Sequence, residues 1–247
     1  MNPIDTSFDF STDAAGGDPD SKSPTLRHYH KQLWSKPLPT GAIFNLHTDI
    51  EGSYLHYKSE TYEVSLSSDS IGHSYRDVKR MKQVIEKISP DEVESFWRLN
   101  CTIGAFIIFP GKKAEGQMTI NQMRGVSPQI ADRFDLTLEC IRRFYSGLDS
   151  PLKKTLNRYS EFFRLFESFQ GYVDFFLLND LVDSIFTSIN FFTPIKEPFT
   201  ESPLQTDADE YLTYRSNSMG FITQRNHRIA KWANREIISM VYTPVEN

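Results

Sequence analysis

The chain has 247 residues, a formal net charge of −5 at pH 7 and an aromatic content of 13%, with 19 phenylalanines. This length allows one large domain or two modest ones, and the aromatic side chains suffice for a hydrophobic core, which excludes disorder of the whole chain. No run of about 18 apolar residues occurs, and the N-terminus lacks a basic region followed by an apolar one, so we expect neither a membrane span nor a secretory signal.

The cysteine and histidine content gives no metal or disulfide pattern. The two cysteines, Cys101 and Cys140, provide neither a disulfide framework nor, by themselves, a zinc site. The six histidines form no HExxH motif and no evident catalytic triad. We therefore expect a protein of the reducing cytoplasm, with no metal site and with no cofactor that the sequence identifies.

The first part of the chain predicts an irregular arm, a helix and a small sheet. Residues 1–24 are rich in aspartate, glycine and proline, which is typical of an irregular arm. A short helix is predicted over 25–34. Three strand candidates follow, separated by turn residues, and they indicate an antiparallel meander over 42–46, 54–57 and 62–66.

The middle of the chain predicts two helices and a buried strand. Apolar residues at helical spacing predict a helix over 74–88, and Ser89 followed by Pro90 predicts the start of the next helix. The apolar run 102–109 is rich in β-branched and aromatic residues, which indicates a buried strand. The polar run 67–70 could serve a polar site at a strand end, or it could be turn residues that precede a helix.

The second half of the chain is predicted to be mainly helical. Helices are expected over 128–145, 151–169, 172–189 and 217–240, with a proline-containing loop over 190–209. Together the elements predict an α+β fold, in which a small N-terminal antiparallel sheet packs on a mainly helical C-terminal half.

No linker divides the chain after the arm, so we expect one domain over 25–247. Within it, the helix over 172–189 is apolar around most of its circumference and is expected at the centre of the core. Asp174 lies on its apolar side. Asp174 could therefore cap a helix that begins after Gly171, or be a buried partner of a basic residue.

Charge is distributed unevenly along the chain. Residues 112–164 hold 10 basic and 6 acidic residues, residues 165–214 hold 1 and 9, and residues 215–235 hold 5 and 0. A globally acidic protein therefore contains two basic segments, and charge asymmetry of this kind bears on partners rather than on fold.

The first basic segment contains a candidate anion site. Arg124 lies just before a predicted helix start at Ser127 and could bind a phosphate or carboxylate bidentately, with Asn121 and Gln122 orienting the ligand. Alternatively, Asn121 and Gln122 satisfy loop backbone and Arg124 pairs with an acid. The segment is not a Walker loop, because no Lys-Ser or Lys-Thr follows its glycine.

The helix predicted over 128–145 carries two acids at i,i+4, Asp135 and Glu139, the spacing of a metal site or of an acid/base pair. The same acids could form surface ion pairs with Arg142 and Arg143, and the commonness of such pairs favours this interpretation. Arg133 lies at the edge of the apolar face and is a further candidate for ligand binding.

The final predicted helix carries a basic stripe. Arg225, Arg228 and Lys231 lie within about a third of the helix circumference, together with Trp232. Basic side chains beside an aromatic ring suit phosphate contact and base stacking. The alternative is a solvated face with a half-buried tryptophan.

Several stretches together are similar to a known family. They are Ser23–Arg27 with Trp34–Pro39, Thr102–Gly104 with Phe109–Gly111, Thr119–Asn121 with Arg124–Gly125, Asp132–Arg143, and Gly171–Phe176. The chain resembles, from about Phe8 to Ile229, a family of uncharacterised bacterial proteins known as a domain of unknown function. The resemblance implies a single bacterial domain and carries over no catalytic residue.

Two functions remain open at this point. The first is binding or processing of a phosphate-bearing ligand, either a nucleotide or nucleic acid. The second is a non-enzymatic interaction or regulatory protein whose acidic and basic patches dock a protein partner or a second copy of the chain. Convergence of Asn121, Arg124 and Arg133 with an acid or a histidine in one pocket would favour the first.

Overall fold

The computed structural model describes residues 4–111 and 116–242. Its four strands form one antiparallel sheet in chain order, β1-β2-β3-β4. The strands are β1 (Leu46–His47), β2 (Leu55–Lys58), β3 (Glu63–Ser70) and β4 (Phe106–Pro110). The first half of β3 pairs with β2, in the register Tyr57 to Val64, and its second half pairs with β4, in the register Ser68 to Ile108. This confirms the predicted small antiparallel sheet.

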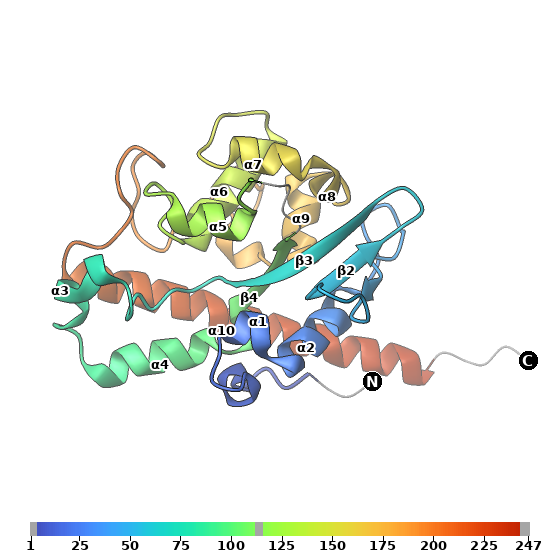
Figure 1. Ribbon diagram of the computed structural model, residues 1–247, viewed down its shortest axis with the longest axis horizontal. Helices are drawn as coiled ribbons and strands as arrows, with labels where there is room; N and C mark the ends of the chain where they lie inside the picture. Colours follow the sequence, from blue (N-terminus) through green and yellow to red (C-terminus); the bar gives the residue numbers. More distant parts are fainter. Residues whose placement is uncertain (1–3, 112–115, 243–247) are drawn as a thin grey trace, which may run out of the picture.

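Helices make up most of the remaining chain. They are η1 (Phe10–Asp13), α1 (Pro19–Lys22), α2 (Pro24–Trp34), η2 (Lys79–Met81), α3 (Lys82–Ile85), α4 (Pro90–Asn100), η3 (Ile103–Ala105), α5 (Ile120–Val126), α6 (Phe134–Tyr145), α7 (Lys153–Arg158), α8 (Ser160–Arg164), α9 (Phe169–Phe176), η4 (Asn179–Leu181) and α10 (Ala208–Tyr242). Helices α5 to α9 lie on one side of the sheet, and α2, α4 and α10 lie on the other (Figure 1). The predicted α+β class is confirmed.

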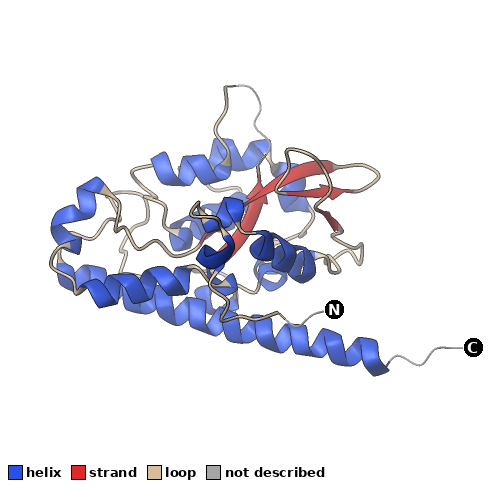
Figure 2. Ribbon diagram, turned by 60° about the horizontal axis from the view of Figure 1, so that its bottom comes forward, coloured by secondary structure: helices blue, strands red, loops and turns tan. Residues whose placement is uncertain are grey.

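The long helix α10 runs along the whole molecule, with α4 beside it (Figure 2). It begins nine residues before the predicted start, at Ala208 rather than 217. Asp207 accepts a hydrogen bond from the backbone N–H of Glu210, and the Glu210 carboxylate accepts one from the N–H of Thr206. This reciprocal capping pattern is a helix-start signal that the sequence contains.

Helix α10 approaches η3 closely at Gly104. A Cβ atom at this position would lie 2.6 Å from the carbonyl oxygen of Ile222 and 2.6 Å from Oδ1 of Asn226. The Gly104 N–H donates a hydrogen bond to that same Asn226 oxygen, at 2.7 Å. A residue without a side chain is therefore required for the contact.

The prediction of one apolar helix over 172–189 is wrong. Helix α9 ends at Phe176, because Leu177 adopts a left-handed conformation with φ of 57°, and η4 and a loop follow. The later apolar residues Leu178 and Leu181 are buried individually rather than along a helix. The apolar residues of this run are buried, but they are not all part of one helix. Hydrophobic periodicity alone cannot distinguish a buried helix from a buried segment of another conformation.

The two interpretations of Asp174 are also wrong. Ser168 caps α9 by accepting a hydrogen bond from the Gly171 N–H. Asp174 is exposed and accepts a hydrogen bond from Nδ2 of Asn179 at 2.6 Å. Asp174 was predicted to lie on the apolar face of a long helix. It lies at the surface instead, because α9 has only 8 residues and the chain leaves the helix after Phe176.

Three other predicted helices differ in extent. The region 74–88 contains only η2 and α3, after a buried Tyr75 with φ of 57°. Helix α6 starts at Phe134 rather than near Pro128, because Ala131 and Asp132 both have positive φ. The region 151–169 breaks into α7 and α8 at Tyr159. Residues such as Tyr75 and Ala131 rarely adopt a positive φ, so the sequence gives almost no signal for these breaks.

The N-terminal segment packs on the same core as the rest of the chain. Residues 4–24, predicted as irregular, contain η1 and α1. Phe10 is fully buried, and its ring contacts those of Tyr29 and Phe106 edge to face.

Within the described residues, no helix has both the length and the apolar character needed to cross a membrane.

Candidate functional site

The predicted anion-binding residues before α6 bind other residues of the same chain. Arg124 is fully buried and forms an ion pair with Asp69, and its Nε donates to Oγ1 of Thr137 at 2.9 Å. Its Nη2 donates to the carbonyl oxygen of Ser70 at 3.1 Å. Arg124 therefore fastens α5 to β3 and α6, and its guanidinium is not accessible to a ligand. The alternative interpretation, pairing with an acid, describes this residue.

Asn121 and Gln122 also bind within the chain. Nδ2 of Asn121 donates to Oγ of Ser67 at 3.0 Å and to the carbonyl oxygen of Ser68 at 2.9 Å. Gln122 forms a capping box with Thr119 at the start of α5. Both amides thus satisfy neighbouring polar groups, as the alternative interpretation expects.

Asp135 and Glu139 form separate ion pairs. The buried Arg133 binds Asp135 through two hydrogen bonds, at 3.1 and 2.5 Å, and Asp135 also accepts from the backbone N–H of Phe192. Glu139, which is 4% exposed, accepts from Arg142 and Arg143 at 2.7 Å each. Both acids are engaged by arginine, so they do not form an acid/base pair. Glu139 pairs with Arg142 and Arg143 as the ion-pair interpretation expects. The expected surface location is wrong, because both carboxylates are buried and Asp135 pairs with Arg133.

The basic stripe of α10 is divided between interior and surface. Arg225 is fully buried and donates to the carbonyl oxygens of Gly104 at 2.9 Å, Phe106 at 2.7 Å and Phe176 at 3.1 Å. In the part of the chain that the structure describes, no carboxylate pairs with it, and burial lowers its pKa. Outside, Arg228 forms two hydrogen bonds of 2.6 Å with Asp180, and Lys231 is exposed.

The predicted residues therefore do not converge on one pocket. Of the four predicted arginines, Arg124 and Arg133 form buried ion pairs. Arg225 binds backbone carbonyl oxygens, and Arg228 pairs with Asp180 at the surface. The two cavities described below are lined by other side chains.

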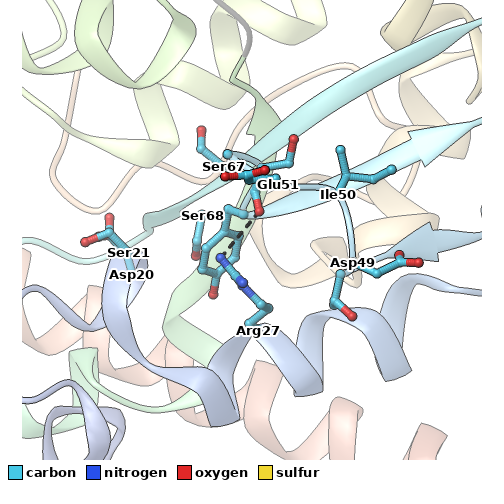
Figure 3. Close-up of a pocket in the computed structure, with 12 residues that line it drawn as sticks. Asp20, Ser21, Arg27, Asp49, Ile50, Glu51, Ser67 and Ser68 are labelled. Carbon is cyan, nitrogen blue, oxygen red and sulfur yellow. Dashed lines mark hydrogen bonds between the residues drawn. The ribbon is translucent and has the colours of Figure 1, made fainter.

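A polar pocket opens between α1, α2 and the sheet (Figure 3). Its volume is about 480 Å³. The residues that line it are Asp20, Ser21, Arg27, Thr48, Asp49, Ile50, Glu51, Gly52, Ser53, Tyr54, Ser67 and Ser68. Six of them carry hydroxyl groups and three carry carboxyl groups, so the polar pocket is rich in hydrogen-bonding atoms.

Four separate segments build the polar pocket. Helix α1 provides Asp20 on one side, and the loop between β1 and β2 provides Asp49 on the other (Figure 3). Strand β3 provides Ser67 and Ser68 between them, and α2 provides Arg27. The polar run 67–70 thus contributes to a polar site, as one of its two interpretations expects, but it does so from within a strand.

The cation of the polar pocket is held against its wall. The guanidinium carbon of Arg27 lies 4.9 Å from the centre of the Tyr54 ring, and Nη2 donates to the carbonyl oxygen of Ser53 at 3.4 Å. A guanidinium stacked on an aromatic face and bonded to a carbonyl keeps its charge, but these contacts fix its position. The acids Asp49 and Glu51 outnumber this single cation among the charged groups of the cavity.

One of the three carboxyl groups, that of Asp20, is not ionised at neutral pH. Its pKa is raised to about 8, first by burial and then by repulsion from the carboxylates of Asp18, Asp69 and Asp132. Burial and like charges both disfavour the ionised form of a carboxyl group. Asp20 therefore binds its proton at neutral pH.

Replacing Asp20 with asparagine is expected to make folding stability less sensitive to rising pH. Because the pKa of Asp20 is higher in the folded chain than its usual 3.8, its contribution to stability is complete below about pH 4 and is lost as pH rises through about 8. Asparagine has no such titration. Urea denaturation of both proteins between about pH 5 and pH 8 should show the wild type losing stability relative to Asp20→Asn, and a constant difference would contradict the raised pKa.

His30 and Ser68 lie at the inner wall, but they do not form a nucleophile–base pair. Nε1 of Trp34 donates to Nδ1 of His30 at 3.0 Å, so the proton of the neutral ring is on Nε2, which donates to Oγ of Ser68 at 3.0 Å. Burial lowers the pKa of His30 to about 3. The ring therefore has no free lone pair to accept the Ser68 proton, which leaves the Ser68 hydroxyl as a donor to other groups.

A comparison with family models finds one match, which covers most of the chain. A family model described as a family of unknown function (DUF6994) matches residues 4–229. The chain belongs to that family. The DUF6994 match spans every residue that lines the polar pocket. No curated protein and no solved structure matches the chain.

The acids of the polar pocket carry no local sequence signal. Asp20 lies in α1, whereas Asp49 and Glu51 lie in the β1–β2 loop of the DUF6994 chain, and only the fold brings them together. Of the residues that line the polar pocket, Ser67 and Ser68 are the ones that belong to the polar run 67–70, which the sequence indicated as a possible polar site.

Proposed function

We propose that the protein binds a small polyhydroxylated ligand that carries a protonated amine, in the polar pocket. The observation that carries the proposal is the lining itself: three carboxyl groups and six hydroxyl groups face one cavity whose arginine is held against Tyr54. Carboxylates attract and hydrogen-bond an ammonium group, and hydroxyl groups both donate to and accept from ligand hydroxyls.

The size and charge of the cavity support this class of ligand. A volume of about 480 Å³ lies within the range of small-molecule pockets. A phosphate group would meet the carboxylates of Asp49 and Glu51, whose negative charges repel it.

The proposal is tested with three related probes: glucosamine, its uncharged parent glucose, and glucose 6-phosphate. At about pH 6.5 the amine is protonated, and a ligand that binds the folded state raises the thermal transition. We expect the largest rise with glucosamine, a smaller one with glucose and none with glucose 6-phosphate. An equal response to glucosamine and glucose 6-phosphate, or no response to any probe, would overturn the proposal.

The double variant Asp49→Asn/Glu51→Gln tests the charge directly. Both side chains are exposed in the β1–β2 loop, so their neutralisation should leave the fold intact. We expect glucosamine affinity to fall about five-fold in titration calorimetry, and glucose affinity to stay the same. Glu60→Gln is the matched control, because Glu60 is an exposed acid in the neighbouring β2–β3 turn and does not line the polar pocket. Unchanged glucosamine affinity in the double variant would contradict the assignment.

A further inference from the structure

A second cavity, the basic pocket, lies beside α7 and the start of α5. It has a volume of about 560 Å³ and shares no residue with the polar pocket. Among the residues that the structure describes, its charged lining consists of Lys153, Lys154 and Arg158 against one acid, Asp149. The basic pocket is therefore a positively charged cavity on a protein whose net charge is −5.

Two contacts orient its charges. Nη2 of Arg158 donates to the carbonyl oxygen of Met118 at 2.5 Å, which fixes the guanidinium at the rim. Nζ of Lys153 lies 3.5 Å from the Asp149 carboxylate, whose side chain is 91% exposed. Lys154 is exposed on the same helix, four residues before Arg158. The excess of positive charge thus resides on Lys154 and Arg158.

A hydrogen-bonding group at the lining adds to this charge. Oγ of Ser150 is buried and makes no hydrogen bond of normal geometry to any described residue. The Cys140 thiol beside it is a weak donor, and its pKa is raised by burial to about 12, so it remains protonated. A buried hydroxyl without a full partner costs free energy, which a bound acceptor would recover.

We propose that the basic pocket binds the phosphate group of a small organic phosphate monoester. The charge of the dianion matches the excess of two cations in the lining. Met118, Met123 and Pro151 provide an apolar wall for the organic part. The volume is sufficient for a molecule of mononucleotide size.

The ligand class agrees with the sequence-based hypothesis, but the residues differ. The segment 112–164 holds 10 basic and 6 acidic residues, and its predicted ligand-binding arginines, Arg124 and Arg133, are buried in ion pairs. Among the described residues of this segment, Lys153, Lys154 and Arg158 are the ones that combine positive charge with a cavity.

The test uses AMP, inorganic phosphate and adenosine in titration calorimetry at constant ionic strength. We expect saturable binding of AMP, weaker binding of inorganic phosphate, and no binding of adenosine up to about 10 mM. Constant ionic strength is required because exposed cations are screened by salt. Absence of AMP and phosphate binding, or equal binding of AMP and adenosine, would overturn the proposal.

Lys154→Gln identifies the site. Because Lys154 is exposed, its replacement should leave the thermal transition unchanged, and AMP affinity should fall about ten-fold. Lys87→Gln is the matched control, an exposed lysine at the end of α3 that does not line the basic pocket. Equal AMP affinity in Lys154→Gln and wild type would place any phosphate binding elsewhere and contradict the assignment. The glucosamine response of Lys154→Gln should be that of the wild type, since the two pockets are separate.

Discussion

Replacement of Arg225 with methionine is expected to destabilise the protein by about 3–5 kcal/mol. The guanidinium is fully buried and donates to the carbonyl oxygens of Gly104, Phe106 and Phe176. Methionine fills a similar volume but has no donor, so these buried acceptors lose their partner. Each unsatisfied buried carbonyl costs free energy, and the costs add to the loss of contact between α10, β4 and α9.

Urea denaturation measures the effect, and two further variants interpret it. Arg228→Met removes an arginine from the next turn of the same helix, where the pair with Asp180 is exposed, and should cost less than about 1 kcal/mol. Arg225→Lys keeps a charge but cannot reproduce the planar fork, so an intermediate loss is expected. If Arg225→Met were as stable as Arg228→Met, the carbonyl contacts would have no structural importance.

Asp135→Asn is the second substitution for which we expect a large effect, about 3–5 kcal/mol. Asparagine has the same shape and still offers an oxygen to the Phe192 N–H, but it leaves the charge of Arg133 buried and uncompensated. Breaking one side of a buried ion pair costs more than the pair contributes, because the remaining charge stays desolvated.

A double-mutant cycle separates these terms. Arg133→Met alone should also destabilise, whereas Arg133→Met combined with Asp135→Asn removes both charges and should recover a large part of the loss in urea denaturation. Strictly additive losses would mean that the two side chains do not interact. A loss below about 1 kcal/mol for Asp135→Asn would mean that the site tolerates the unpaired arginine.

The elements with local start and stop signals were predictable from the sequence. Helix α2 follows Ser23 and begins at Pro24, and α4 begins at Pro90, within one residue of expectation. The helices that were predicted wrongly end or begin near residues such as Leu177 and Ala131, which have positive φ. No local pattern in a single sequence records that conformation.

The candidate sites show the same division. Arg225, Arg228 and Lys231 look alike on a helical wheel, yet the first is buried against backbone carbonyls and the others face outward. A charge count cannot distinguish these cases, because a buried cation satisfied by carbonyl oxygens has no acidic partner in the sequence. Ser67 and Ser68 were recognisable as a polar run, whereas the acids opposite them belong to distant segments that only the fold brings together.

The position of Arg225 in the chain has a consequence for synthesis. It follows Phe176 by 49 residues and Gly104 by 121. At about 5–20 residues per second, a ribosome adds Arg225 roughly 2 to 10 s after Phe176 and roughly 6 to 24 s after Gly104. During that interval Arg225 cannot donate to the carbonyl oxygens of Gly104 and Phe106, and water takes its place as the hydrogen-bond donor. Water therefore remains in this part of the core until Arg225 arrives. The nascent protein must therefore complete its interior late, when the α10 segment docks.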